Sequence, residues 1–82
     1  MKTAEISIRP FDALYDLPTA HKWTTSDVAA CIPASWTVAD LRAVAALCFS
    51  CADRRERHDD PSTAAEYDWI GRELVKRADL PE

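Results

Sequence analysis

The side chains with the greatest chemical potential in this sequence are three cysteines and two histidines. Cys48 and Cys51 stand three residues apart, and Cys31, His21 and His58 complete a set of ligand types that zinc accepts. Zinc sites of this kind usually contain a second closely spaced pair, and the sequence has none. Cys48 also falls in an apolar helical pattern, where a thiol behaves as a small core residue. We therefore expect free thiols and no bound metal.

Other catalytic chemistry has little support. A redox Cys-x-x-Cys pair lies at a helix N-terminus, where the dipole lowers the thiol pKa, whereas this pair lies well inside a predicted helix. His21 and His58 stand in polar stretches, with no recognisable nucleophile motif nearby. A single glycine leaves no Gly-rich loop to hold phosphates. The sequence therefore predicts a protein that is not an enzyme, with no catalytic residues and no cofactor.

The net charge and the lack of targeting signals limit the classes of partner and the compartment that we expect. A domain that binds nucleic-acid phosphate usually has a net positive charge, so the net charge of −4 argues against general DNA or RNA binding. The sequence starts without the apolar run of a signal peptide, and no stretch approaches the length of a membrane span. Three cysteines in a chain without an export signal are typical of the reducing cytoplasm. We expect a cytoplasmic protein that does not contact membranes.

The chain length and apolar periodicity predict one small, mainly α-helical domain over residues 1–82. In this prediction residues 1–24 form an N-terminal strand and loop segment, and residues 25–82 form the helical core. Disorder is not expected, because three Trp, two Tyr and two Phe are too much aromatic surface to leave in water.

The first third of the chain carries signals for three short elements. Residues 5–9 alternate polar and apolar side chains, which predicts a strand. A short helix is expected over residues 11–17, followed by a second over residues 25–31. Thr25 or Ser26 is the expected N-cap of this second helix.

Two long amphipathic helices follow. Thr37 and Asp40 have the spacing of a capping box at the start of the first helix. Asp60 and Pro61 have the residue types of a cap and a first helical position for the second, which runs to about Arg77. The short connection between them predicts an antiparallel hairpin of helices.

The apolar faces of these two helices define the expected core. The first helix contributes Val38, Leu41, Val44, Ala45, Cys48, Phe49 and Ala52. The second contributes Ala64, Tyr67, Ile70, Gly71, Leu74 and Ala78. A glycine inside a helix costs about 1 kcal/mol relative to alanine. Gly71 therefore indicates a close approach between the helices.

Candidate binding residues lie away from this predicted core. Trp69 falls nearly opposite the Ile70–Leu74 stripe, on the same side as Arg72 and Lys76. Tryptophan and arginine are enriched at the hot spots of protein interfaces, which predicts a partner-binding face. The alternative for Trp69 is that it packs against the N-terminal segment of its own chain.

Two further candidates come from the loops and helix ends. Arg54, Arg55 and Arg57, followed by His58, form a basic cluster in an acidic chain. These residues complement the dipole at a helix C-terminus, and they are also candidates to bind an acidic partner. Trp23 lies in a polar loop, where it either anchors the loop or contacts a partner.

Residues 25–45 contain the pattern Asp27-Val28-Ala29 followed by Ser35-x-Thr37-Val38. This pattern resembles the helix-turn-helix of lac-repressor-type regulators, although Thr37 comes one residue early and Pro33 replaces the glycine of the turn. The resemblance implies that the second helix would read base edges. That helix instead presents apolar Val44, Leu47 and Phe49. A helix-turn-helix DNA-binding regulator is therefore the alternative function.

The function that these observations favour is protein–protein interaction, with the chain acting as a regulator or inhibitor. In size and charge the chain is similar to the small inhibitors of phages and mobile elements, anti-CRISPR proteins included. That likeness implies an inhibitor that works by binding. A second copy of the chain is a further expected partner, as a homodimer.

Overall fold

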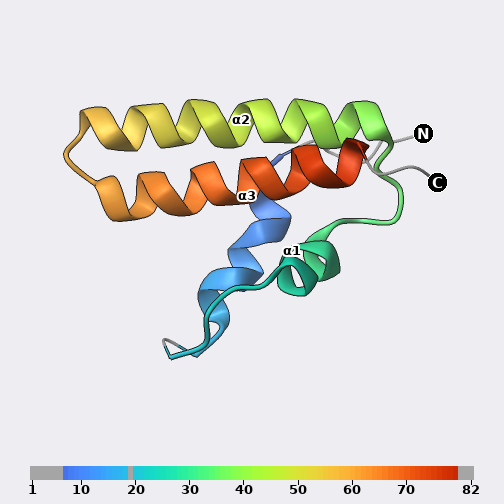
Figure 1. Ribbon diagram of the computed structural model, residues 1–82, viewed down its shortest axis with the longest axis horizontal. Coiled ribbons are helices and arrows are strands. Elements are labelled where there is room, and N and C mark those ends of the chain that lie inside the picture. Colours follow the sequence, from blue (N-terminus) through green and yellow to red (C-terminus); the bar gives the residue numbers. More distant parts are fainter. Residues whose placement is uncertain (1–6, 19, 80–82) are drawn as a thin grey trace.

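The computed structural model describes residues 7–18 and 20–79, and these residues are mainly helical (Figure 1). The predicted helical fold class is confirmed. Four helices follow one another along the described chain: η1 (Arg9–Asp16), α1 (Thr25–Cys31), α2 (Val38–Arg57) and α3 (Pro61–Asp79). The element η1 is a 3-10 helix, and the other three are α-helices.

The predicted N-terminal strand is wrong at its described positions. Ser7 and Ile8 form a bend, and Arg9 begins η1, while residues 5 and 6 lie outside the described residues. Pro10 lies in the first turn of η1, where its fixed φ suits a helix and its missing N–H costs nothing. The alternation over residues 5–9 was too short to outweigh this signal, and Ile8 packs against the core instead.

Helix α1 spans the predicted residues, but it is capped one residue earlier than expected. Its N-cap is Thr24, because the Asp27 amide donates to Thr24 Oγ1 over 3.3 Å and the Thr24 amide donates to Asp27 Oδ2 over 2.8 Å. Thr25 is therefore inside the helix. The three-residue spacing from Thr24 to Asp27 completes a capping box, which neither Thr25 nor Ser26 can form.

The predicted starts of the two long helices are confirmed. The Asp40 amide donates to Thr37 Oγ1 over 3.2 Å, and the Thr37 amide donates to Asp40 Oδ2 over 2.8 Å, which is the expected capping box. Before α3, Asp60 Oδ1 accepts from the Thr63 amide over 3.4 Å, and Pro61 takes the first helical position.

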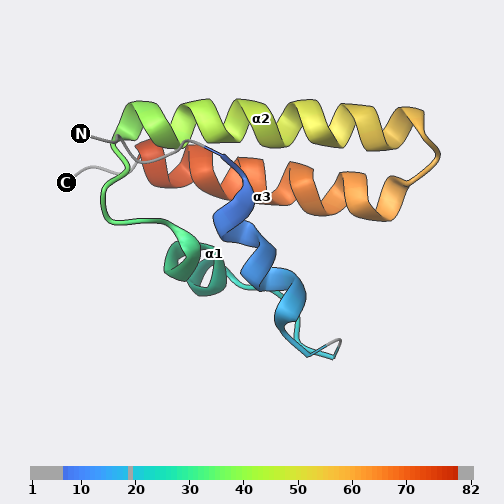
Figure 2. The ribbon, with the colours of Figure 1, turned by 180° about the vertical axis from the view of Figure 1, so that it is seen from behind.

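Helices α2 and α3 form the predicted antiparallel hairpin and lie side by side along their whole length (Figures 1 and 2). Gly71 of α3 marks their close approach, as expected, because a Cβ at this position would stand 2.8 Å from Phe49 Cε1. Phe49 is not a core residue, since 37% of it is exposed. Its ring covers the glycine from the edge of the hairpin.

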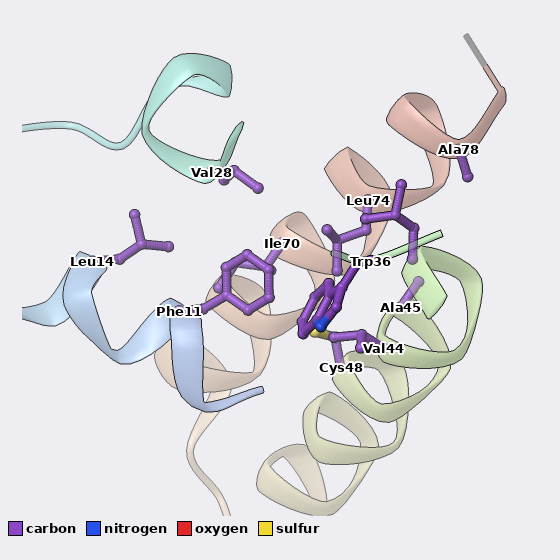
Figure 3. Close-up of a cluster of buried hydrophobic side chains, with 11 residues drawn as sticks. Phe11, Leu14, Val28, Trp36, Val44, Ala45, Cys48, Ile70, Leu74 and Ala78 are labelled. Atoms are coloured by element: carbon purple, nitrogen blue, oxygen red, sulfur yellow. The ribbon is translucent and has the colours of Figure 1, made fainter. Parts of the chain in front are cut away.

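The N-terminal half of the described chain closes one face of the hairpin. Helix α1 packs against η1 and α3. Figure 3 shows Phe11 and Leu14 of η1 and Val28 of α1 directed toward side chains of the hairpin. The rings of Phe11 and Trp36 lie 6.1 Å apart at 56°, above buried side chains of α2 and α3. The core therefore has three layers, in which η1 and α1 form the third.

One buried carboxylate links the third layer, through α1, to the hairpin. Glu73 of α3 is 5% exposed, and its Oε1 accepts a hydrogen bond of 2.5 Å from Thr25 Oγ1 of α1. Its other oxygen lies 3.0 Å from Lys76 Nζ. These hydrogen bonds, that from Thr25 foremost, hold the pKa of Glu73 below its ordinary value. A buried charge is tolerated here because both oxygens have donors.

Candidate functional site

Three aromatic side chains from three segments meet beside α3. Trp23, in the loop before α1, lies 6.3 Å from Trp69 of α3 between ring centroids, with the ring planes at 41°. Tyr15 of η1 meets Trp23 edge to face, at 5.0 Å and 86°. Both are favourable geometries for aromatic pairs. The row Tyr15–Trp23–Trp69 therefore joins the N-terminal segment to the last helix.

A network of hydrogen bonds holds the loop that carries Trp23. The His21 amide donates to the Pro18 carbonyl over 2.8 Å, and His21 Nε2 lies 2.8 Å from Asp27 Oδ2. The same Asp27 oxygen accepts from the Thr24 amide, so one carboxylate fixes the loop on both sides of Trp23. The hydrogen bond with His21, followed by that with Thr24, lowers the pKa of Asp27.

An open groove of about 510 Å³ runs along this aromatic row. Its apolar wall consists of Leu14, Tyr15, Leu17, Trp23, Ala65 and Trp69. Lys22 and Glu66 also line it, so the groove carries one charge of each sign. We call this hollow, with these residues, the aromatic groove. Concave, largely apolar sites with a few polar groups are the usual shape of binding sites.

Tyr15 is the most exposed aromatic side chain of the groove, with 45% of its surface in solvent. Partial burial of its hydroxyl, followed by the nearby negative charge of Glu66, raises the pKa of Tyr15 well above its ordinary value. The phenol therefore stays protonated at neutral pH. It offers a hydrogen-bond donor at the edge of an apolar surface, which suits a contact residue.

The structure brings two predicted contact residues together and separates others from them. Trp23 and Trp69 share the aromatic groove, with Trp69 half-buried against the core cluster. Arg72 lies outside the lining of this groove, and its Nε contacts Asp68 Oδ2 at 2.9 Å along the surface of α3. Lys76 contacts the buried Glu73, near α1. Trp69 therefore lines the aromatic groove, whereas Arg72 and Lys76 lie outside it, and the partner-binding face of Trp69, Arg72 and Lys76 stays a prediction.

The basic cluster at the end of α2 is also divided. Arg54, Arg55 and His58 line a smaller hollow of about 360 Å³, together with Tyr67. Arg57 does not line it, because its guanidinium contacts Asp53 at 3.1 Å along the exposed surface of α2. This hollow does not indicate a particular ligand, because its basic side chains are also explained by their favourable interaction with the dipole at the α2 C-terminus.

Of the residues that line the groove, the sequence marked only Trp23 and Trp69 as candidate binding residues, and Tyr15 and Glu66 are among those that it missed. Tyr15 falls in the short helix predicted over residues 11–17, where its residue type favours apolar packing, but 45% of it is exposed. No local signal identifies either residue, because the groove arises where residues 14–18 and 21–23 meet residues 65–69.

The cysteines do not gather around a common centre. Cys48 is fully buried, Cys31 and Cys51 are half-buried, and all three thiols are free. Over residues 7–18 and 20–79, no three potential ligand side chains lie close enough to hold a metal ion. Burial, followed by the neighbouring Cys51, raises the pKa of Cys48 to about 12. This thiol has the environment of a core residue.

The helix-turn-helix comparison can be judged from the packing of α1 and α2. In such a motif the two helices pack on each other across a short turn. Here six residues separate α1 from α2, and α1 packs on η1 and α3 without contacting α2 in the described part of the chain. The geometry gives the DNA-binding alternative no support, and that function stays a prediction.

Comparisons of the chain with protein-family models, with curated proteins and with solved structures find no match. None of the helices within residues 7–18 and 20–79 combines the length and apolar character that a membrane span requires.

Proposed function

We propose that this chain acts by binding a partner protein, a segment of which occupies the aromatic groove. The observation that carries the proposal is the partly exposed row Tyr15–Trp23–Trp69 along an open, largely apolar hollow. Tyrosine and tryptophan offer large contact areas at low entropic cost and dominate the energetics of many interfaces. A chain that binds in this way acts as a regulator or an inhibitor by occupying the surface of its partner.

The chemistry of the groove defines the segment that it fits. The aromatic rings and Leu14, Leu17 and Ala65 favour an apolar side chain as the central anchor. Lys22 and Glu66 favour a polar or charged flank on the same segment, because the groove carries both signs.

Affinity purification of the tagged protein from its own host identifies the partner, and titration of the purified pair then tests the groove. We expect Tyr15→Ala to weaken binding about 30-fold or more, the effect of a hot-spot truncation of about 2 kcal/mol. Tyr15 is the preferred position because an exposed side chain can be truncated without emptying the core, so a loss of binding is separable from a loss of the fold. Val38→Ala is the matched control, since Val38 is equally exposed but lies on α2 outside the groove.

Tryptophan fluorescence supplies an independent measurement. Trp23 and Trp69 line the groove, whereas Trp36 is buried in the core. Partner binding should therefore change the emission of the wild-type chain, and a variant with Trp23→Phe and Trp69→Phe should lose this change. Unaltered affinity of Tyr15→Ala, together with an unchanged emission on binding, would refute the assignment of the groove.

A further inference from the structure

Helix α2 has a second face that no described element covers. Among the described helices only α3 contacts α2. Both views of the ribbon show α2 at an edge of the molecule, with α3, α1 and η1 all on one side of it (Figures 1 and 2). The opposite surface is defined by Ala39, Ala43, Ala46, Leu47 and Ser50, and we call it the outer face of α2. All five residues are exposed.

The centre of this outer face lacks charge. The ten residues from Ala43 to Ala52 include none, so three successive turns of an exposed helix carry no charged side chain. Leu47, one of the four large hydrophobic side chains that are exposed in the described chain, lies on this face with 42% of its surface in solvent. A surface helix with only solvent on its outer side normally carries charged residues there.

Charges of opposite sign border this neutral centre at its two ends. Asp40 and Arg42 precede it, and Asp53 and Arg54 follow it. At about 100° per residue, Arg42 and Asp53 fall within about 20° of each other on one edge of the outer face. Asp40 and Arg54 fall within about 40° of each other on the opposite edge. Each edge therefore has one positive and one negative end. The positive end is N-terminal on the edge with Arg42 and C-terminal on the edge with Arg54.

This arrangement is complementary to itself under a two-fold rotation. When two copies of α2 pack antiparallel by their outer faces, each edge of one helix meets the same edge of the other. Arg42 then stands opposite Asp53 of the second copy, and Asp40 opposite Arg54 of the second copy. The two-fold axis must pass halfway between the residues of each pair. The residue numbers of Arg42 and Asp53 average to 47.5, and those of Asp40 and Arg54 average to 47. Both pairs therefore place the axis beside Leu47, roughly midway along α2.

We propose that the outer face of α2 is the interface of an antiparallel homodimer. The antiparallel orientation places the basic C-terminal end of each helix, with Arg54 and Arg57, beside the acidic N-terminal end of the other, with Asp40. It also aligns the two helix dipoles in opposite directions, which is the favourable arrangement. The small side chains at Ala43 and Ala46 allow the two helices to approach closely. The dimer leaves the aromatic groove free, because the groove lies along α3 and the N-terminal segment.

Sedimentation of the full chain across the micromolar to millimolar range tests this interface. We expect the wild type to shift from monomer to dimer as concentration rises. Ala46→Glu should abolish the shift, since the two-fold axis brings the new carboxylate close to its own copy. Ala30→Glu is the matched control, because Ala30 is likewise an exposed helical alanine but lies on α1. Dichroism and thermal unfolding check that each variant is folded.

Charge exchange tests the predicted register. Arg42→Asp and Asp53→Arg should each weaken the dimer at least tenfold, and the double variant should recover most of the wild-type affinity. Each single variant also removes an exposed ion pair within the chain, Arg42 with Asp79 or Asp53 with Arg57. Folding of the monomers is therefore measured alongside.

Three results would overturn the proposal. The first is a wild-type chain that stays monomeric throughout, as it would if residues 1–6 or a different protein covered the outer face. The second is a dimer that Ala46→Glu leaves intact, and the third is a double charge variant no better than the single ones. Ala46→Glu should leave partner binding in the aromatic groove unchanged, so failure of this proposal and failure of the proposed function are distinguishable.

Discussion

The ring of Phe49 on α2 stands directly over Gly71 on α3, with Cε1 2.8 Å from the position that a Cβ on residue 71 would occupy. No Cβ tolerates a heavy atom at that distance, so the ring can lie there only because residue 71 is a glycine. The ring in turn covers backbone that a side chain at position 71 would otherwise cover. Phe49 is 37% exposed and can rotate outward. The consequence of a substitution at Gly71 therefore depends on Phe49.

We expect Gly71→Ala to lower the free energy of unfolding. Alanine gains about 1 kcal/mol from its higher helix propensity. Displacement of the Phe49 ring costs about 1–3 kcal/mol, the usual effect of overpacking. The expected net loss is up to about 2 kcal/mol, measured as a lower urea midpoint at unchanged slope.

The effect of Gly71→Ala on the free energy of unfolding should change sign when the Phe49 ring is absent. In a Phe49→Ala background the space above residue 71 is open, so Gly71→Ala should raise the free energy of unfolding by up to about 1 kcal/mol. A double-mutant cycle in urea measures this coupling. Equal effects in the two backgrounds would show that Phe49 does not limit residue 71.

The capping box at Thr37 should contribute measurably to stability. Thr37→Ala removes the Oγ1 atom that accepts from the Asp40 amide, at the start of a helix of 20 residues. We expect the free energy of unfolding to fall by about 0.5–2 kcal/mol. Thr37→Ser is the matched control, because its hydroxyl keeps the acceptor. Loss of the same stability in both variants would assign the effect to the threonine methyl group instead of the cap.

Features that depend on residues close together in sequence could be predicted. The cap of α2 rests on Thr37 and Asp40, and the start of α3 on Asp60 and Pro61, so each signal lies within a few residues. The hairpin follows from two apolar stripes and a short connection. The close approach at Gly71 was likewise predictable, because a glycine inside a helix needs a packing reason.

Features that depend on residues far apart could not be predicted in detail. Trp69 packs against the N-terminal segment, as one of the two predicted alternatives states, but no sequence signal identified Trp23 as its partner. The contact between Trp23 and Trp69 and the hydrogen bond between Thr25 and Glu73 each join positions more than 40 residues apart. Glu73 has the residue type of a solvated surface, and only the placement of α1 buries it. The predicted strand failed at residues 7–9 for a different reason, since period-two alternation over five residues is weak beside the helix signal of Pro10.

Acid should unfold the chain partly through Glu73. Because the folded state holds the pKa of Glu73 below its ordinary value, this carboxylate stabilises the fold fully above that ordinary value, about 4.3. The stabilisation is lost as the pH falls through the lowered folded-state pKa. We expect Glu73→Gln to be less stable than wild type at neutral pH and to show a flatter loss of stability in acid.

Urea unfolding over a series of pH values measures this difference. Glu56→Gln is the control, because it removes an exposed carboxylate on α2. The wild type and Glu56→Gln should lose stability in parallel in acid, with Glu73→Gln diverging from both. If all three chains follow the same acid profile, the Thr25–Glu73 hydrogen bond does not contribute to the pH dependence.

The three thiols should react at different rates in the native protein. Cys48 is fully buried with a pKa raised to about 12, whereas Cys31 and Cys51 are half-buried. A thiol reagent followed by peptide mass spectrometry should label Cys31 and Cys51 first and Cys48 only as the chain unfolds. Denatured protein should give three reactive groups. Stoichiometric zinc in elemental analysis of the native protein would contradict the prediction of free, unliganded cysteines.

Binding to duplex DNA should be weak and independent of sequence. The net charge of −4 opposes association with phosphates, and Arg42, the basic residue in the first half of α2, already contacts Asp79 at 2.7 Å. Helix α1 does not pack on α2 as the first helix of a helix-turn-helix would. In gel shifts, any complex should disappear as salt is raised, and competitor duplexes of different sequence should displace it equally. A tight complex at physiological salt that one sequence alone displaces would favour the DNA-binding regulator over the interaction protein, and Arg42→Ala would then show whether α2 reads that sequence.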